Sequence, residues 1–133
     1  MIKKIFVITL TVLFLFSLTA CGGSPEKVRK ISYEGTELTV TLGTNQATGY
    51  DWDFEIDGNC IRQSINKSFK ITGLNANIGE VNIGFQGLSE GSAKITFTTP
   101  VGWGGTGKGD VYIVNVTVGG DGSILSAKES NAK

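Results

Sequence analysis

Residues 50–57 are Tyr50-Asp51-Trp52-Asp53-Phe54-Glu55-Ile56-Asp57, with a large apolar side chain at every second position. Successive side chains of a β-strand point to opposite faces of the sheet, so this stretch predicts a strand with one apolar and one acidic face. Outward from it, the same period of two returns at residues 38–42, 81–85, 93–97 and 112–118. Weaker candidate strands lie at residues 28–33, 61–65 and 68–72.

Short strands separated by turns account for nearly all of the chain after Cys21, where no segment has the apolar period of an amphipathic helix. Seven to eight such strands predict an all-β fold, an immunoglobulin-like antiparallel β-sandwich, with a closed barrel as the alternative. A length of 133 residues suits one domain, which we place at residues 31–118. Residues 119–133 begin with three glycines in four positions, so we expect a mobile C-terminal tail with at most one edge strand at Ser123–Ala127.

The first twenty residues predict a lipoprotein signal peptide. Lys3 and Lys4 precede an uncharged apolar run at residues 5–18, which as a helix would span roughly 21 Å, less than the ~30 Å hydrocarbon core of a bilayer. The residues that follow, Leu18-Thr19-Ala20-Cys21, resemble a bacterial lipobox, whose cysteine receives a diacylglycerol before cleavage.

This resemblance implies lipidation of Cys21, a lipid-anchored linker at residues 21–30, and a domain on the extracytoplasmic side of a bacterial cell membrane. An ordinary secreted protein that is cut near Ala20 is the alternative. With a lipid on Cys21, Cys60 has no partner for an intramolecular disulfide, and we expect it to be a partly buried thiol.

The composition excludes several classes of function. The chain has no histidine, which removes Ser-His-Asp triads, Cys-His proteases and histidine-ligated metal sites. Without Lys3 and Lys4, 10 basic residues stand against 12 acidic ones, which is no footprint of a nucleic-acid-binding protein. We expect a monomer that is not an enzyme and that holds no cofactor and no metal.

Three motifs resemble known functional sites, but each has a feature that argues against that function. Residues 102–109 nearly match a phosphate-binding loop, but they lead into a predicted strand, whereas such a loop must open a helix. Residues 53–58 resemble the start of a calcium loop, yet the twelfth position is Ser64 instead of a bidentate glutamate. The acidic residues of the same stretch could be paired carboxylates of a glycosidase, although a half-exposed strand needs the same alternation.

Two loops carry a more specific signal. Residues 45–52 are Asn-Gln-Ala-Thr-Gly-Tyr-Asp-Trp, and residues 99–105 are Thr-Pro-Val-Gly-Trp-Gly-Gly. Trp103 stands among glycines, where no strand face can form, so we expect an exposed aromatic anchor for a partner. The alternative is that Trp103 folds back as a lid over the end of the sandwich.

These loops resemble those of the chagasin family of cysteine protease inhibitors. That family is immunoglobulin-like and fills the cleft of papain-like proteases with an Asn-Pro-Thr-Thr-Gly-(Tyr/Phe)-x-Trp loop, a glycine-rich loop and an Arg-Pro-Trp loop. The first motif is matched at Asn45, Thr48, Gly49, Tyr50 and Trp52, and the last at Trp103. Gln46 and Ala47 replace the proline and the first threonine, Val101-Gly102 replaces Arg-Pro, and residues 74–79 match the middle loop poorly.

The resemblance implies a reversible protein inhibitor that occludes the active-site cleft of a papain-like cysteine protease. Thr48 and Gly49 would approach the catalytic cysteine, Asn45 would hold its loop through local hydrogen bonds, and Tyr50 with Trp52 would fix the loop base. A cell-surface binding module for a carbohydrate or another protein is the alternative. The expected protease-binding residues are Asn45, Gln46, Ala47, Thr48, Gly49, Tyr50, Asn75, Asn77, Gly102, Trp103 and Gly104.

Overall fold

The computed structural model describes residues 28–130, which form eight strands and one short 3-10 turn. The elements are β1 (Arg29–Glu34), β2 (Glu37–Asn45), η2 (Gln46–Thr48), β3 (Asp53–Asp57), β4 (Ile61–Ile71), β5 (Ile78–Gly87), β6 (Gly91–Thr98), β7 (Val111–Val118) and β8 (Ile124–Ser130). Between residues 28 and 130 no helix is long and apolar enough to span a membrane. The predicted leader, Cys21 and residues 131–133 lie outside the described residues.

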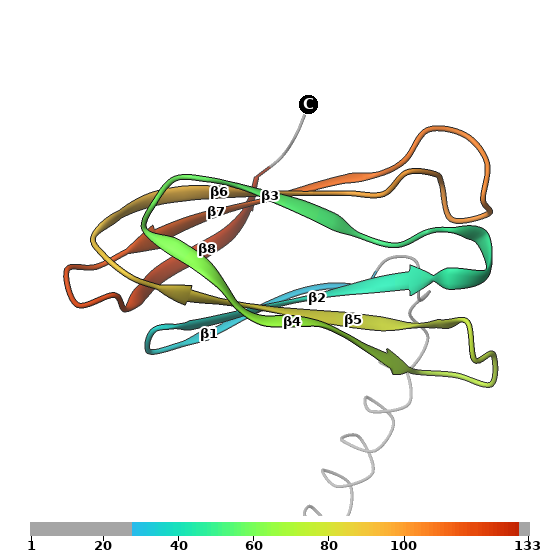
Figure 1. The fold of residues 1–133 in the computed structure, drawn as a ribbon, viewed down its shortest axis with the longest axis horizontal. Coiled ribbons are helices and arrows are strands. Elements are labelled where there is room, and N and C mark those ends of the chain that lie inside the picture. Colours follow the sequence, from blue (N-terminus) through green and yellow to red (C-terminus); the bar gives the residue numbers. More distant parts are fainter. Residues whose placement is uncertain (1–27, 131–133) are drawn as a thin grey trace, which may run out of the picture.

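The strands form two four-stranded sheets, ordered β1-β2-β5-β4 and β3-β6-β7-β8, and all neighbouring strands are antiparallel. Figure 1 shows the sheets as two facing layers. The chain passes from one sheet to the other between β2 and β3, between β3 and β4, and between β5 and β6. The expected all-β fold with antiparallel sheets is confirmed.

The core lies between the two layers and contains the apolar positions that the alternation predicts. Each of these side chains stabilises the fold by about 1.5–3 kcal/mol when fully buried. The largest fully buried side chains are Trp52, Tyr50, Phe85, Phe97, Leu38, Leu42, Ile83, Ile95, Val40, Val81, Val114 and Val116.

Aromatic rings connect the two sheets across the middle of the core. Phe54 on β3 packs edge-on against Phe85 on β5, with ring centroids 5.2 Å apart. The rings of Phe85 and Phe97 on β6 are also nearly perpendicular, with centroids 6.1 Å apart. Within the second sheet, the ring of Phe97 packs against that of Tyr112 on β7 at a centroid distance of 6.1 Å. Perpendicular packing suits the quadrupoles of aromatic rings, so the two contacts of Phe85 with Phe54 and Phe97 fix the two layers relative to one another.

The structure differs from the predicted boundaries in four places. The strand predicted at residues 50–57 begins only at Asp53, because Tyr50 pairs with Asn45 to close a loop and Asp51 and Trp52 lie in no strand. The predicted linker ends earlier than expected, because Arg29 and Lys30 already pair with β2. Residues 61–65 and 68–72 were expected as separate strands, but 61–71 form the single strand β4, whose register against β5 shifts twice. The edge strand expected within the tail is present as β8 and continues to Ser130. Residues 124–130 therefore belong to the second sheet and not to a mobile tail, and Ile124 and Ala127 are buried.

A close backbone approach at Gly87 gives a test of the packing. A Cβ atom placed on Gly87 would lie 2.0 Å from the carbonyl oxygen of Gly122. We expect Gly87→Ala to lower the free energy of unfolding by about 2 kcal/mol or more, because two backbone segments must move apart. Urea denaturation measures this, with Gly120→Ala as the matched control, since a Cβ there meets nothing within 4 Å. Equal unfolding free energies for the two variants would contradict this packing.

Candidate binding site

Three loops lie at the same end of the domain, on the right in Figure 1. The first loop (residues 46–52) joins β2 to β3, the second (residues 72–77) joins β4 to β5, and the third (residues 99–110) joins β6 to β7. The first loop is bonded to both others: Gln46 N donates to Asn77 O at 2.9 Å, and Thr48 Oγ1 donates to Trp103 O at 2.7 Å. The three loops therefore form one continuous surface, the loop end.

The first loop is a closed turn. The backbones of Asn45 and Tyr50 bond to one another in both directions at 2.9 and 3.0 Å, which closes the loop at its base. Gly49 ends the η2 turn with φ +84°, a conformation that favours glycine, and its N–H donates to Gln46 O. The chain can therefore reverse direction within the few residues at the tip.

Two polar side chains connect the first loop to the third. Asn45 was expected to bond within its own loop, but its Nδ2 donates to Trp103 O at 3.3 Å. The local contact is made by Thr48, whose hydroxyl has Asn45 O at 3.1 Å besides Trp103 O. Gly105 packs against the same threonine, since a Cβ on Gly105 would lie 3.1 Å from Thr48 Cβ.

Trp103 is partly buried and packs against the core. Its ring meets the buried ring of Tyr50 at a centroid distance of 5.1 Å and an angle of 65°. The expectation of a freely exposed anchor is therefore too simple, because part of the indole acts as the lid considered above. Part of the Trp103 side chain keeps its exposed surface.

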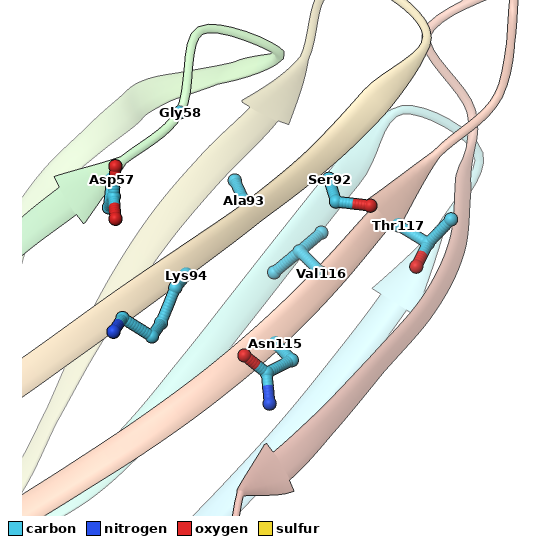
Figure 2. A pocket seen from close by; sticks show the side chains of 8 residues that line it. All are labelled: Asp57, Gly58, Ser92, Ala93, Lys94, Asn115, Val116 and Thr117. Carbon is cyan, nitrogen blue, oxygen red and sulfur yellow. The ribbon is translucent and has the colours of Figure 1, made fainter.

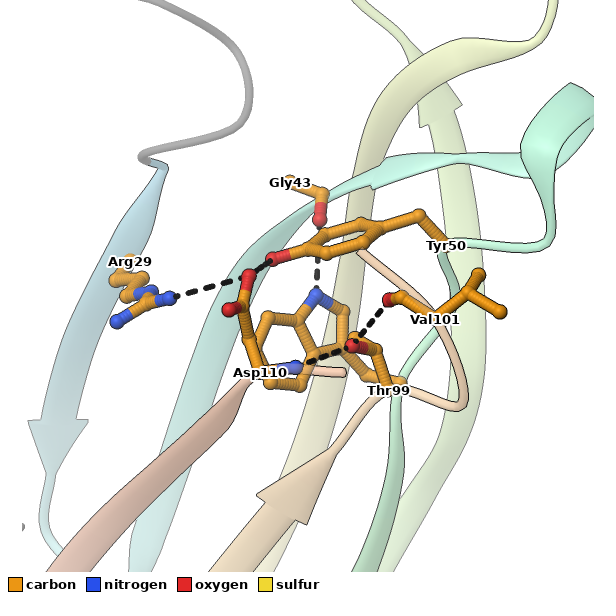
Figure 3. Close-up of polar contacts among 7 residues, drawn as sticks. Arg29, Gly43, Tyr50, Thr99, Val101 and Asp110 are labelled. Carbon is orange, nitrogen blue, oxygen red and sulfur yellow. Dashed lines mark hydrogen bonds and ion pairs between the residues drawn. The ribbon is translucent and has the colours of Figure 1, made fainter. Parts of the chain in front are cut away.

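A polar network supports the base of the loops (Figure 3). Tyr50 is fully buried, so it supports the loop end from below and cannot itself touch a partner. Its hydroxyl donates to Asp110 Oδ2 at 2.5 Å, and Arg29 Nη2 lies 3.9 Å from the same oxygen. Burial raises the pKa of Tyr50 to about 12, and the negative charge of Asp110 acts in the same direction.

The base of the third loop is held by Thr99, whose hydroxyl donates to Val101 O at 2.9 Å and accepts from Asp110 N at 2.8 Å.

The second loop presents one apolar side chain that the sequence analysis did not select. Leu74 is fully exposed at its tip. The turn behind it is ordered by the side chain of Asn75, which accepts a hydrogen bond from Asn77 N at 2.9 Å. The sequence did contain a signal for this contact residue, because Leu74 is an isolated apolar residue between Gly73 and Asn75. Asn45, which was expected to contact the protease, is buried. The other predicted contact residues that keep exposed or partly exposed surface are Gln46, Ala47, Thr48, Gly49, Asn75, Asn77, Gly102 and Gly104.

The remaining motifs form no second site. Residues 102–109 form no helix, and the acidic side chains of β3 are exposed along a sheet edge. Among the described residues no group of three metal-ligating side chains comes together. Cys60 is buried and forms no disulfide within the described part of the chain.

A shallow hollow of about 480 Å³ lies on the outer face of the second sheet (Figure 2). Its lining includes the cross-strand neighbours Lys94 and Asn115, together with Asp57 and Gly58 at the end of β3. This hollow lies toward the end of the domain opposite the three loops, so its residues serve as controls for the loop end.

Comparisons with known proteins give no match: no protein-family model, no curated protein and no solved structure matches this chain.

The buried hydroxyl of Tyr50 predicts a specific dependence of stability on pH. The pKa of Tyr50 rises from its ordinary 10.0 to about 12 on folding, so the folded chain retains this proton at pH values where the unfolded chain has lost it. The free energy of unfolding should therefore fall by about 1.4 kcal/mol per pH unit between about pH 10 and pH 12. In Tyr50→Phe, urea unfolding over this range should show only the smaller fall that remains from Tyr112, whose pKa burial also raises. The same slope in both proteins would contradict the assignment.

Proposed function

We propose that this chain is a reversible inhibitor of papain-like cysteine proteases of the chagasin type, built on an immunoglobulin-like sandwich. We propose further that a lipid on Cys21 anchors it to the extracytoplasmic side of a bacterial membrane. The observation that carries the proposal is the alignment of the three loops, with the first loop bonded to the loop on either side. A protein that fills a cleft without chemistry needs such a wedge.

The tip of the first loop suits insertion into a narrow cleft. Gly49 is exposed and has no side chain to collide with an approaching backbone. Thr48 stands beside it and is held by Trp103 O. In this mechanism the pair covers the catalytic cysteine of the protease, and no bond is made or broken.

The two positions that depart from the family motif by losing a proline both use the N–H that proline lacks. Gln46 N donates to Asn77 O at 2.9 Å, which ties the first loop to the second. Gly102 N donates to Thr106 O at 3.2 Å, within the third loop. Proline restricts a loop through its ring, whereas here hydrogen bonds restrict it, and both reduce the conformational entropy lost on binding.

The alternative function, a carbohydrate-binding module, receives less support from the loop end. Such a site needs a second exposed ring beside the indole of Trp103, to form a platform. The ring that contacts Trp103 is Tyr50, which is fully buried. A protein partner other than a protease would use the same three loops, and inhibition assays separate it from the proposed function.

Thr48→Arg tests the wedge. A long charged side chain at the tip should block insertion and weaken inhibition of a papain-like peptidase about 30-fold or more. The measurement is a titration of peptidase activity with each purified protein, and Lys94→Glu in the distant hollow is the charge-changing control that should inhibit like the unmodified chain. If the folded, unmodified chain inhibits no such peptidase at micromolar concentration, the loop end serves another partner.

Leu74→Asp tests the contribution of the second loop. The side chain contacts nothing in the free protein, so the substitution should leave the unfolding free energy unchanged while weakening inhibition about tenfold. Leu88→Asp is the matched control, because Leu88 is also exposed but follows β5 at the opposite end of the domain. Equal losses of inhibition in the two variants would show that Leu74 makes no specific contact.

A further inference from the structure

The chain enters the described domain at the loop end. Strand β1 is antiparallel to β2, with Arg29 opposite Leu42, and Gly43 N donates to Val28 O at 2.9 Å. Gly43 is three residues before Gln46, where the first loop begins. The hairpin between β1 and β2 therefore lies at the far end, and the start of β1 lies beside the loops (Figure 1).

Arg29 fixes this entry point to the base of the loops. Its guanidinium carbon lies 5.7 Å from the ring centroid of Trp52 and 5.4 Å from that of Tyr112. Its Nη2 faces Asp110, the acceptor of the Tyr50 hydroxyl. A cation placed over aromatic faces and beside a carboxylate is held from several sides, so the preceding segment cannot leave from elsewhere without breaking these contacts.

The preceding segment is short. Seven residues, 22–28, separate Cys21 from Arg29, and the eight Cα–Cα steps between these two residues span at most about 29 Å when fully extended. The ten residues of β5 run from the loop end to the far end, a distance of about 30 Å. A lipid on Cys21 would therefore keep the loop end within reach of the bilayer and leave the far end free to point outward.

We propose that the anchor and the three loops share one end of the domain, so that the anchored protein holds its loops toward the membrane. This rests on the proposed lipidation of Cys21 and concerns the proposed inhibitory site. A folded protease domain of roughly 200 residues is about 40 Å across, which exceeds the reach of the segment. The anchored protein consequently associates slowly with a protease in bulk solution, and its accessible targets are proteases that approach along the membrane surface.

The orientation can be measured without any protease. Full-length lipidated protein is placed in phospholipid vesicles with an acceptor dye on the lipid headgroups, and a donor dye is attached through Leu74→Cys or Leu88→Cys. Cys60 is buried, so it does not compete for the label. Energy transfer should be stronger from position 74 than from position 88. Equal transfer, stronger transfer from position 88, or mass spectrometry that shows no lipid on Cys21 would overturn the inference.

The consequence for access is measured as an association rate with a soluble papain-like peptidase. The vesicle-bound protein should associate about fivefold more slowly, or slower still, than unanchored residues 22–133, which include both sheets. Inserting about 20 Gly/Ser residues after Gly23 should restore the rate, whereas the same insertion after Lys133 should not. Equal rates for the anchored and unanchored proteins would refute restricted access. A lack of inhibition by the unanchored protein would refute the proposed function, while the energy-transfer result would still decide the orientation.

Discussion

Tyr50 and Trp52 bring two hydrogen-bond donors into the apolar core, and each donor must find an acceptor there because an unpaired buried donor is costly. Trp52 Nε1 donates to Gly43 O at 2.8 Å, and the Tyr50 hydroxyl donates to Asp110. The two rings pack edge-on at 5.6 Å. This pair joins the end of β2 to the start of β7, which belong to different sheets, and the first and third loops are built on it.

The strands could be predicted from the sequence because burial of one face imposes a period of two. Leu38, Val40 and Leu42 illustrate this, since all three are fully buried. Alternation does not predict a strand where the sheet itself is irregular. Residues 63–68 of β4 include two shifts of register, and their side chains are exposed, so no alternation indicated that the strand continues through them. The glycines before β8 suggested a free tail, whereas they form a turn from which Ile124 returns to the core.

The loop end was predictable only in part. Asn45, Thr48, Gly49 and Trp103 could be selected from the sequence, and the structure brings them together. The bond between Thr48 and Trp103 spans 55 positions, however, and no local pattern encodes such a contact. The alternation at residues 50–57 already placed Tyr50 on an apolar face, and it is fully buried. The roles of Arg29 and Asp110 depend on how the two sheets face one another, so they became visible only in three dimensions.

The irregular register of β4 has a consequence for self-association. This strand forms one edge of its sheet, and its side chains from Arg62 to Ile71 are exposed, including Ile65 and Phe69. A long, flat, apolar edge would be a template for adding strands from neighbouring copies and hence for fibril growth. The two register shifts interrupt the row of free backbone groups, and Lys67, which donates to Asp51 and Trp52 O, places a cation there. The β4 edge is thus poorly suited to extending the sheet from one molecule to the next.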